Sequence, residues 1–309
     1  MLSYMVRKQF KIKWTSILSH TTKLDIPLFK MADKYNLRWA IKASEWQPSY
    51  DEVLAASSYI QNDEKVRIST FVFQDDAKSS LLGRLMLRKF VHMATSIPYE
   101  EIRFGRDNYQ KPYLIGAGDT PLSFNVSHQG EYVVLAGNTS KNIGIDVMKI
   151  EPPANKNVPE FFRLMTRQFS NHEWETIKSF PTEKEQMICF YRVWCLKESY
   201  VKNTGIGLNI PLKQISFHIK THNMEVGKLV TDTVLYKEDV LRTDWVFEET
   251  LLEDTYTVAV SLQITDPSNN VPAPYKFLNF EEIVHEAKPL FEPDSKFSMD
   301  FMNKQKKSF

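Results

Sequence analysis

Residues 183–205, EKEQMICFYRVWCLKESYVKNTG, are typical of one long helix that carries two charged residues one turn apart, Glu198 and Lys202. The helical periodicity continues to about residue 203, and Gly205 supplies the glycine that commonly ends a helix. Most charged pairs at this spacing are exposed salt bridges that contribute only about 0.2–0.5 kcal/mol. Trp194, one turn before Glu198, would shield the acid from water. Shielding raises the affinity of a carboxylate for a proton or a metal ion, so this helix is also a candidate for function.

A second acid lies upstream in Gly144-Ile145-Asp146, inside the apolar run 142–148 that is typical of a strand. A charge among apolar neighbours is costly unless it is paired or binds a cation. The alternative is that Asp146 lies in solvent at the end of the strand. If Asp146 and Glu198 meet in the fold, they form a site for a magnesium ion that holds a diphosphate.

Two alternating segments, 122–126 and 132–137, predict a hairpin that turns at Gln129-Gly130. A largely polar tetrapeptide begins within the first segment and ends just before the turn. We place this tetrapeptide at the hairpin tip; its residues are Asn125, Val126, Ser127 and His128. The serine and histidine suggest a hydrolase, but neighbouring strand residues point to opposite faces, so the imidazole cannot activate the hydroxyl. Two interpretations remain, donors to phosphate oxygens or an ordinary polar turn.

Cationic side chains upstream could hold the rest of a nucleotide. Arg106 and Lys111 enclose a polar loop of Asp107, Asn108, Tyr109 and Gln110, which suits a phosphate and a base, and Arg67 is a further candidate. The helix predicted over residues 77–94 carries Arg84, Arg88 and Lys89, and charge rows of that kind are usually solvated. Neither glycine-rich phosphate loop, the Walker pattern or the dinucleotide pattern, occurs in the sequence.

Composition excludes several classes of function. The chain has 309 residues, of which 42% are hydrophobic, and its 39 basic residues nearly balance 38 acidic ones. That balance argues against general binding to nucleic acid. No uncharged apolar run approaches the roughly 18 residues of a membrane span. The two cysteines, Cys189 and Cys195, match no zinc signature and are interpreted as reduced, partly buried thiols of a cytosolic protein.

The order of predicted elements indicates an α/β (α+β) fold. Both halves show a long helix, a short strand and then a hairpin, which suggests a pseudo-twofold duplication with the active site in the cleft between two subdomains. We expect an N-terminal extension over residues 1–32, a candidate for disorder, with a mitochondrial presequence as the alternative. The subdomains are expected over residues 33–149 and 150–265. Residues 266–309 are expected to form a loosely packed tail, partly docked through a segment at 277–284.

These motifs together resemble those of the 4′-phosphopantetheinyl transferases of the surfactin-synthetase-activating type. The resemblance rests on Gly144-Ile145-Asp146 and on the pattern Trp194-x-x-Lys197-Glu198-Ser199-x-x-Lys202, with support from the asparagine, serine and histidine of 125–128. It covers about residues 37–262. It implies two α/β halves with coenzyme A bound between them, and transfer of phosphopantetheine to a carrier-protein serine.

The resemblance also implies roles for individual residues. Asp146 and Glu198 would bind Mg²⁺, with Glu198 as the candidate base, and Lys202 would contact the phosphates. Coenzyme A would be held by Arg67, by Arg106 to Lys111 and by Asn125 to His128. The implied partners are apo acyl carrier domains of the cytosolic fatty acid synthase and of an aminoadipate-pathway enzyme, and the protein is expected to be a monomer.

One departure and two rival functions remain. Bacterial relatives commonly place a third acid where this chain has Met148, and we expect a water molecule at that coordination position. A metal-dependent phosphodiesterase or pyrophosphatase could use the same two acids without an acceptor protein. A catalytically silent carrier-binding module is the other alternative, although Asp146, Glu198 and Lys202 are all present.

Overall fold

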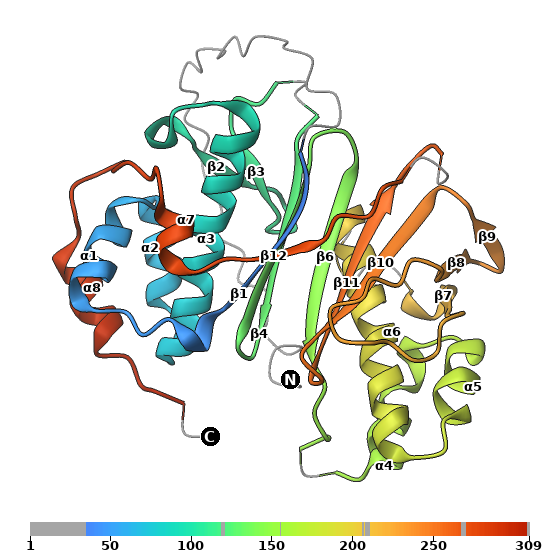
Figure 1. Ribbon diagram of the computed structural model, residues 1–309. Coiled ribbons are helices and arrows are strands. Elements are labelled where there is room, and N and C mark those ends of the chain that lie inside the picture. The colour runs from blue at the N-terminus through green and yellow to red at the C-terminus, as the bar shows by residue number, and fades with distance from the viewer. Residues whose placement is uncertain are drawn as a thin grey trace.

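Two sheets face each other between two sets of helices in a mixed α/β structure (Figure 1). The computed structural model describes residues 35–118, 121–154, 156–205, 207, 211–266 and 270–307. The extension expected over residues 1–32 lies outside these ranges. The mixed helix and strand content confirms the predicted fold class.

The first half of the chain, joined by one strand from the C-terminal segment, forms one sheet and its helical cover. The sheet has the order β12 (Tyr275–Phe277), β1 (Asn36–Lys42), β5 (Tyr132–Asn138) and β4 (Ser123–Gln129), in which β12 alone runs parallel to its neighbour. Three helices cover the outer face: α1 (Tyr50–Ser58), α2 (Asn62–Ser69) and α3 (Gln74–Thr95). Along β5, Val133 and Leu135 face these helices, while Val134 and Ala136 face the second sheet, as the period of two requires.

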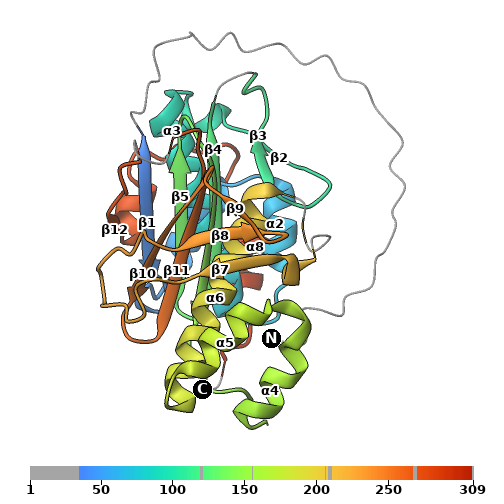
Figure 2. The ribbon, with the colours of Figure 1, turned by 90° about the vertical axis from the view of Figure 1, so that its right-hand side faces the viewer.

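The second half repeats the layering with a different helical cover. Its sheet has the order β10 (Trp245–Leu252), β11 (Tyr256–Gln263) and β6 (Asn142–Lys149). Figure 2, where this half faces the viewer, shows its cover of α4 (Val158–Met165), α5 (Asn171–Ser179) and α6 (Glu183–Thr204). The described residues also form two smaller sheets. One pairs β2 (Phe104–Arg106) with β3 (Pro112–Leu114). The other has the order β7 (Ile215–His218), β8 (Val234–Lys237) and β9 (Val240–Arg242).

The long helix α6 has the ends that its sequence predicts. Thr182 caps its first turn by accepting a hydrogen bond from the backbone N–H of Glu185, whose side chain accepts in return. Gly205 ends it in the left-handed region, at φ +66°. Both ends are specified by residues within four positions of each other, so local sequence is sufficient to define this element.

The edges of the two sheets meet at β4 and β6 through side chains. Ser123 Oγ, Asn125 Oδ1 and Gln129 Oε1 accept hydrogen bonds of 2.7–3.1 Å from the backbone N–H groups of Ile143, Ile145 and Lys149 on β6. The spacing of two keeps these β4 side chains on one face. Residues 125–128 therefore lie within β4, and their prediction at the hairpin tip is wrong. The turn follows Gln129, where Gly130 adopts φ +55°.

The C-terminal segment is packed much more closely than a loose tail. α7 (Phe280–Val284) and α8 (Ser295–Met302) join the helical core of the first half, where Phe301 has no exposed surface. Phe280 stacks on Trp46 with ring centroids 4.3 Å apart. Lys304 Nζ donates hydrogen bonds to the carbonyls of Ser69, the last residue of α2, and Phe71. The expected docking near 277–284 is thus only one part of this contact.

Candidate active site

Asp146 lies on the face of β6 that is covered by α6. Its neighbours Ile145 and Val147 face the other sheet, and Asp146 itself is only 4% exposed. Gly144, two residues earlier, shares its face. A Cβ at Gly144 would lie 2.1 Å from the backbone oxygen of Ser199 on α6. The glycine therefore allows the close contact that brings the C-terminal half of α6 to Asp146.

The Asp146 carboxylate is bound on one oxygen and unpartnered on the other. Lys202 Nζ and Ser127 Oγ each lie 2.7 Å from Oδ1, and they are also 2.7 Å from each other. Oδ2 is buried without a hydrogen-bond partner among the described residues. The interpretation of Asp146 as a solvated strand end is therefore wrong. A buried anion with a free oxygen is arranged to receive a cation.

Glu198 is the second acid of this site. Burial, and next the negative charge of Asp146, raise its pKa to about 7, although Lys202 acts in the opposite direction. The two carboxylates are therefore near enough to repel each other, as the sequence hypothesis requires. Lys202 forms its ion pair with Asp146, so the interpretation of an exposed salt bridge between Glu198 and Lys202 is wrong. The predicted high proton affinity of Glu198 is confirmed.

Ser127 and His128 point to opposite sides of β4, as expected. Ser127 is buried against Asp146, whereas His128 is exposed. Desolvation by the protein around it, followed by the positive charges of Lys202 and Arg84, lowers the pKa of His128 to about 4. The imidazole is therefore neutral at pH 7, with one N–H to donate. The Val126 side chain packs against the first helical core.

The predicted loop residues gather beside the C-terminal end of α6. Arg67 Nη1 and Arg106 Nη1 both donate to Gln110, to its side-chain and main-chain oxygens at 3.4 and 2.7 Å. Asp107 Oδ1 accepts from the backbone N–H groups of Tyr109 and Lys111 and so orders the turn. Lys111 Nζ donates to the carbonyl of Asn203, 3.2 Å away, which ties the loop to α6. Three loop side chains are exposed, those of Asn108, Tyr109 and Gln110.

Two arginines of α3 differ from their predicted solvation. Arg88 has no exposed surface and donates to the Ile102 carbonyl, Gln61 and Glu64. Arg84 is partly buried, and its Nη1 has no hydrogen-bond partner among the described residues. Arg88 lies three residues after Leu85 on α3, so it shares the apolar face of this helix. This spacing is the sequence signal that could have placed it inside.

The described residues also test the predictions about a metal site, the cysteines and membrane spans. No group of three or more metal-ligating side chains occurs within the described residues, so the metal hypothesis rests on Asp146 and Glu198. Both cysteines are free and buried, which confirms their interpretation as unpaired thiols. None of the helices within the described ranges has the length and hydrophobicity that a membrane crossing would require.

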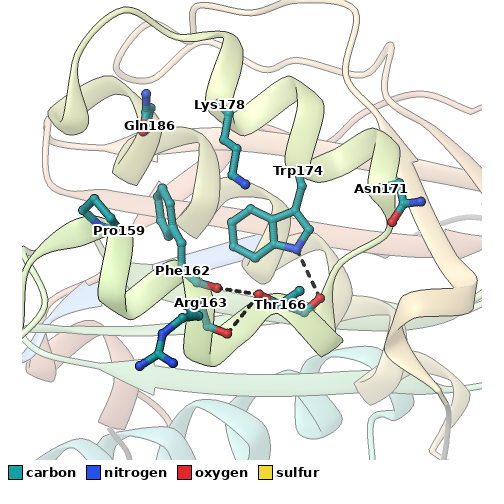
Figure 3. A pocket seen from close by; sticks show the side chains of 8 residues that line it. All are labelled: Pro159, Phe162, Arg163, Thr166, Asn171, Trp174, Lys178 and Gln186. Atoms are coloured by element: carbon teal, nitrogen blue, oxygen red, sulfur yellow. Dashed lines mark hydrogen bonds between the residues drawn. The ribbon is translucent and has the colours of Figure 1, made fainter.

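A separate hollow of about 580 Å³ lies among α4, α5 and the start of α6 (Figure 3). Trp174 and Phe162 form part of its wall, and the Trp174 indole N–H donates to the carbonyl of Thr166, 3.2 Å away. Arg163 and Lys178 add positive charge to its lining. None of the predicted site residues lines this hollow, so its size is no argument for placing the chemistry there.

Comparison with known proteins agrees with the motifs. A family model for the N-terminal region of 4′-phosphopantetheinyl transferases matches residues 44–140, and a model of the 4′-phosphopantetheinyl transferase superfamily matches residues 142–261. The L-aminoadipate-semialdehyde dehydrogenase-phosphopantetheinyl transferase of Homo sapiens is 38% identical over 275 residues, which cover 84% of this chain and 89% of the human protein. The protein of the same name in Xenopus laevis is 36% identical, over 89% of this chain and 94% of its own length.

A bacterial relative shows that the similarity extends beyond animals. The 4′-phosphopantetheinyl transferase of Bacillus subtilis is 33% identical over 170 residues, or 55% of this chain and 70% of the bacterial protein. These matches confirm the resemblance seen in the motifs around Asp146 and Glu198. The chain belongs to the 4′-phosphopantetheinyl transferase superfamily.

Proposed function

We propose that this protein transfers the 4′-phosphopantetheine group of coenzyme A to a serine of an apo acyl or peptidyl carrier domain. The observation that carries the proposal is the pair of carboxylates, Asp146 and Glu198, where α6 packs on β6. Asp146 has one buried oxygen with no hydrogen-bond partner in the described part of the chain, and burial beside that charge raises the pKa of Glu198 to about 7. Lys202 adds a cation within the same hydrogen-bonded group. Family membership supports this assignment over other uses of two acids.

The two acids suit a magnesium ion. Carboxylate oxygens are the ligands that Mg²⁺ prefers, and the ion commonly keeps several water molecules. Asp146 Oδ2 and the Glu198 carboxylate are the oxygens that would hold it. With Met148 in place of a third acid, water and substrate oxygens would complete the coordination. Bound Mg²⁺ would neutralise charge on the diphosphate.

The chain's own residues account for proton and charge movement. The carrier serine Oγ forms a bond to the β-phosphorus as the bond from that phosphorus to the bridging oxygen breaks, and adenosine 3′,5′-bisphosphate leaves. Glu198 takes the hydroxyl proton, directly or through water, and its pKa of about 7 is well matched to that role. Lys202 uses two of its three N–H donors on Asp146 and Ser127, which leaves one for the leaving phosphate.

The remaining predicted residues would hold coenzyme A. Arg67 and Arg106 meet at Gln110, and Lys111 ties the same loop to α6. Ser127 and His128 lie on the same strand, and the positive charges of Lys202 and Arg84 both act on His128. We assign Asp107, Asn108, Tyr109, Asn125 and Val126 to the same binding surface, through side chain or backbone.

We infer that the fold is a pseudo-twofold duplication and that the ligand lies where the halves meet. Both halves present a helix of 22 residues, α3 or α6, on the outer face of a sheet that is antiparallel except for the β1–β12 pair. The boundaries expected at residues 149 and 265 stay proposals. The family models divide the chain earlier, at about residue 141, which agrees with the pairing of β6 in the sheet of the second half, and the second model ends at residue 261. Residues 270–307 then cover the first half.

The expected partners are acidic carrier domains. Several relatives are named for L-aminoadipate-semialdehyde dehydrogenase, which supports an aminoadipate-pathway enzyme as one client. We propose the cytosolic fatty acid synthase as the other. Action as a cytosolic monomer is part of the same proposal and rests on composition and family resemblance.

The test measures the mass of an apo carrier domain after incubation with coenzyme A and Mg²⁺. The wild-type protein should add one phosphopantetheine group, while Asp146→Ala and Glu198→Gln should lose nearly all activity and stay folded. Glu175→Gln, an exposed change on α5, is the matched control. Retention of more than a few per cent of activity removes that acid from the essential residues. Consumption of coenzyme A without a carrier would instead support a phosphodiesterase, and failure to bind coenzyme A in calorimetry a silent module.

A further inference from the structure

Arg84 lies beside the candidate site on α3. The preceding residue, Gly83, packs on β4 so closely that an added Cβ would lie 3.1 Å from Val126 Cγ1. This contact places Arg84 next to the strand that carries Ser127 and His128. Arg84 Nη1 is buried, yet no donor of Arg84 has a hydrogen-bond partner within the described part of the chain. Arg88, one turn later, has its donors on Ile102, Gln61 and Glu64.

Burial of a guanidinium donor costs free energy when no anion pairs with it. The missing hydrogen-bond partner of Arg84 Nη1 therefore needs an explanation. Arg67, Arg84 and Arg106 form no ion pair within 4.0 Å with any residue that the structure describes. Burial lowers the pKa of Arg84 to about 10; Glu64 opposes this change, whereas the charges of Arg106 and Arg67 add to it. Three neighbouring guanidinium groups without a paired acid repel each other. A bound anion would remove both the repulsion and the cost of the buried donor.

The arrangement of charge indicates which anionic group this would be. Coenzyme A carries a diphosphate and, on its ribose, a separate phosphomonoester. In the proposed function the diphosphate would be bound by Lys202 and by the Mg²⁺ ion that Asp146 and Glu198 hold. His128 is influenced by both Lys202 and Arg84, so it lies near a cation of each set. Glu64 and Asp63 act on Arg84 and Arg106 only from beyond ion-pair distance, so the planar donors of the arginine set are left to bind a dianion directly.

We propose that Arg84 is a substrate-binding residue that recognises the ribose 3′-phosphomonoester of coenzyme A. It thereby helps the protein to distinguish coenzyme A from 3′-dephospho-coenzyme A. The inference rests on the proposed function, because it takes coenzyme A as the ligand. It adds a residue of α3, from outside the loop and strand motifs, to the binding surface.

The test is calorimetric titration of the full chain with coenzyme A and with 3′-dephospho-coenzyme A. Arg84→Met should weaken binding of coenzyme A by about 10- to 100-fold, the range for lost hydrogen bonds to a charged group. It should change binding of the dephospho compound by less than about twofold. Arg84→Lys keeps the charge but loses the planar fork, and it should give a smaller loss for coenzyme A alone. Without ligand, Arg84→Met should unfold at the same or a higher temperature than wild type, since it removes an unpaired buried charge.

Lys89→Met is the matched control, because it removes one positive charge from the same helix on a side that faces the carbonyl of His285. It should leave both affinities unchanged. Equal weakening of the two ligands by Arg84→Met or Arg84→Lys, or no weakening of coenzyme A, would overturn the proposal. A wild-type protein that binds neither ligand would refute the proposed function itself, so the two failures are distinguishable.

Discussion

The raised pKa of Glu198 predicts that removing its charge stabilises the protein while it destroys activity. The pKa rises from an ordinary value of 4.5 to about 7. At 1.36 kcal/mol per pKa unit this corresponds to about 3 kcal/mol. Because Glu198 is partly exposed, we expect Glu198→Gln to raise the free energy of unfolding by about 2–3 kcal/mol at alkaline pH in protein free of metal and coenzyme A.

The sign of the effect gives it a distinctive pH dependence. The folded protein holds the Glu198 proton more tightly than the unfolded chain does, so this group's contribution to stability is complete below about pH 4.5 and is lost as pH rises through about 7. Glutamine cannot ionise and avoids that loss. The two proteins should therefore be almost equally stable at low pH, and the difference should reach its full value above neutral pH.

The assay is urea unfolding of both proteins in chelator at several pH values from about 5 to about 8. Glu175→Gln, the exposed control on α5, should differ from wild type by less than about 0.5 kcal/mol at every pH. The reasoning is refuted if Glu198→Gln is no more stable than wild type at pH 8, or if its advantage does not grow with pH. Added Mg²⁺ should stabilise the wild type and leave the glutamine variant nearly unchanged.

Three other substitutions test the elements that hold the site. Gly144→Ala should reduce carrier modification more than 100-fold and lower the urea midpoint, because its Cβ would lie 2.1 Å from the Ser199 oxygen and push α6 away. Glu173→Gln should cost about 3–5 kcal/mol in urea unfolding, because it leaves Lys197, its fully buried ion-pair partner at 2.9 Å, without a counter-charge. Phe301→Ala should cost about 3–5 kcal/mol by calorimetry, because it empties a buried position in the first helical core.

Each of these has a result that would contradict it. Normal activity of Gly144→Ala would show that α6 and β6 tolerate a wider separation. The double change Glu173→Gln with Lys197→Met should recover part of the lost stability, and no recovery would argue against the unpaired charge as its cause. Met299→Ala, at a position 52% exposed on α8, is the control for Phe301, and an equal effect of both would rule out the core contact.

Local patterns were sufficient for much of the fold. The capping residues of α5 and α6, the left-handed end at Gly205 and the turn at Gly130 all depend on residues within a few positions of each other. The tail was the main failure, since its Pro-rich composition hides that Phe301 fills a core built by residues far away in the sequence. Such burial depends on which surfaces meet, and local composition does not encode it.

The sequence by itself determined which acids and which lysine form the motif, and that Asp146 stands on a strand and Glu198 on a helix. Only the tertiary structure decided their partners: Lys202 turns to Asp146 instead of its helical neighbour, and Arg84 Nη1 finds no hydrogen-bond partner among the described residues. The physical reason is that charge pairing follows distance and burial. Two contacts set the distances and the burial here. Helix α6 packs directly on the backbone of Gly144, and side chains of β4 accept hydrogen bonds from the edge of β6.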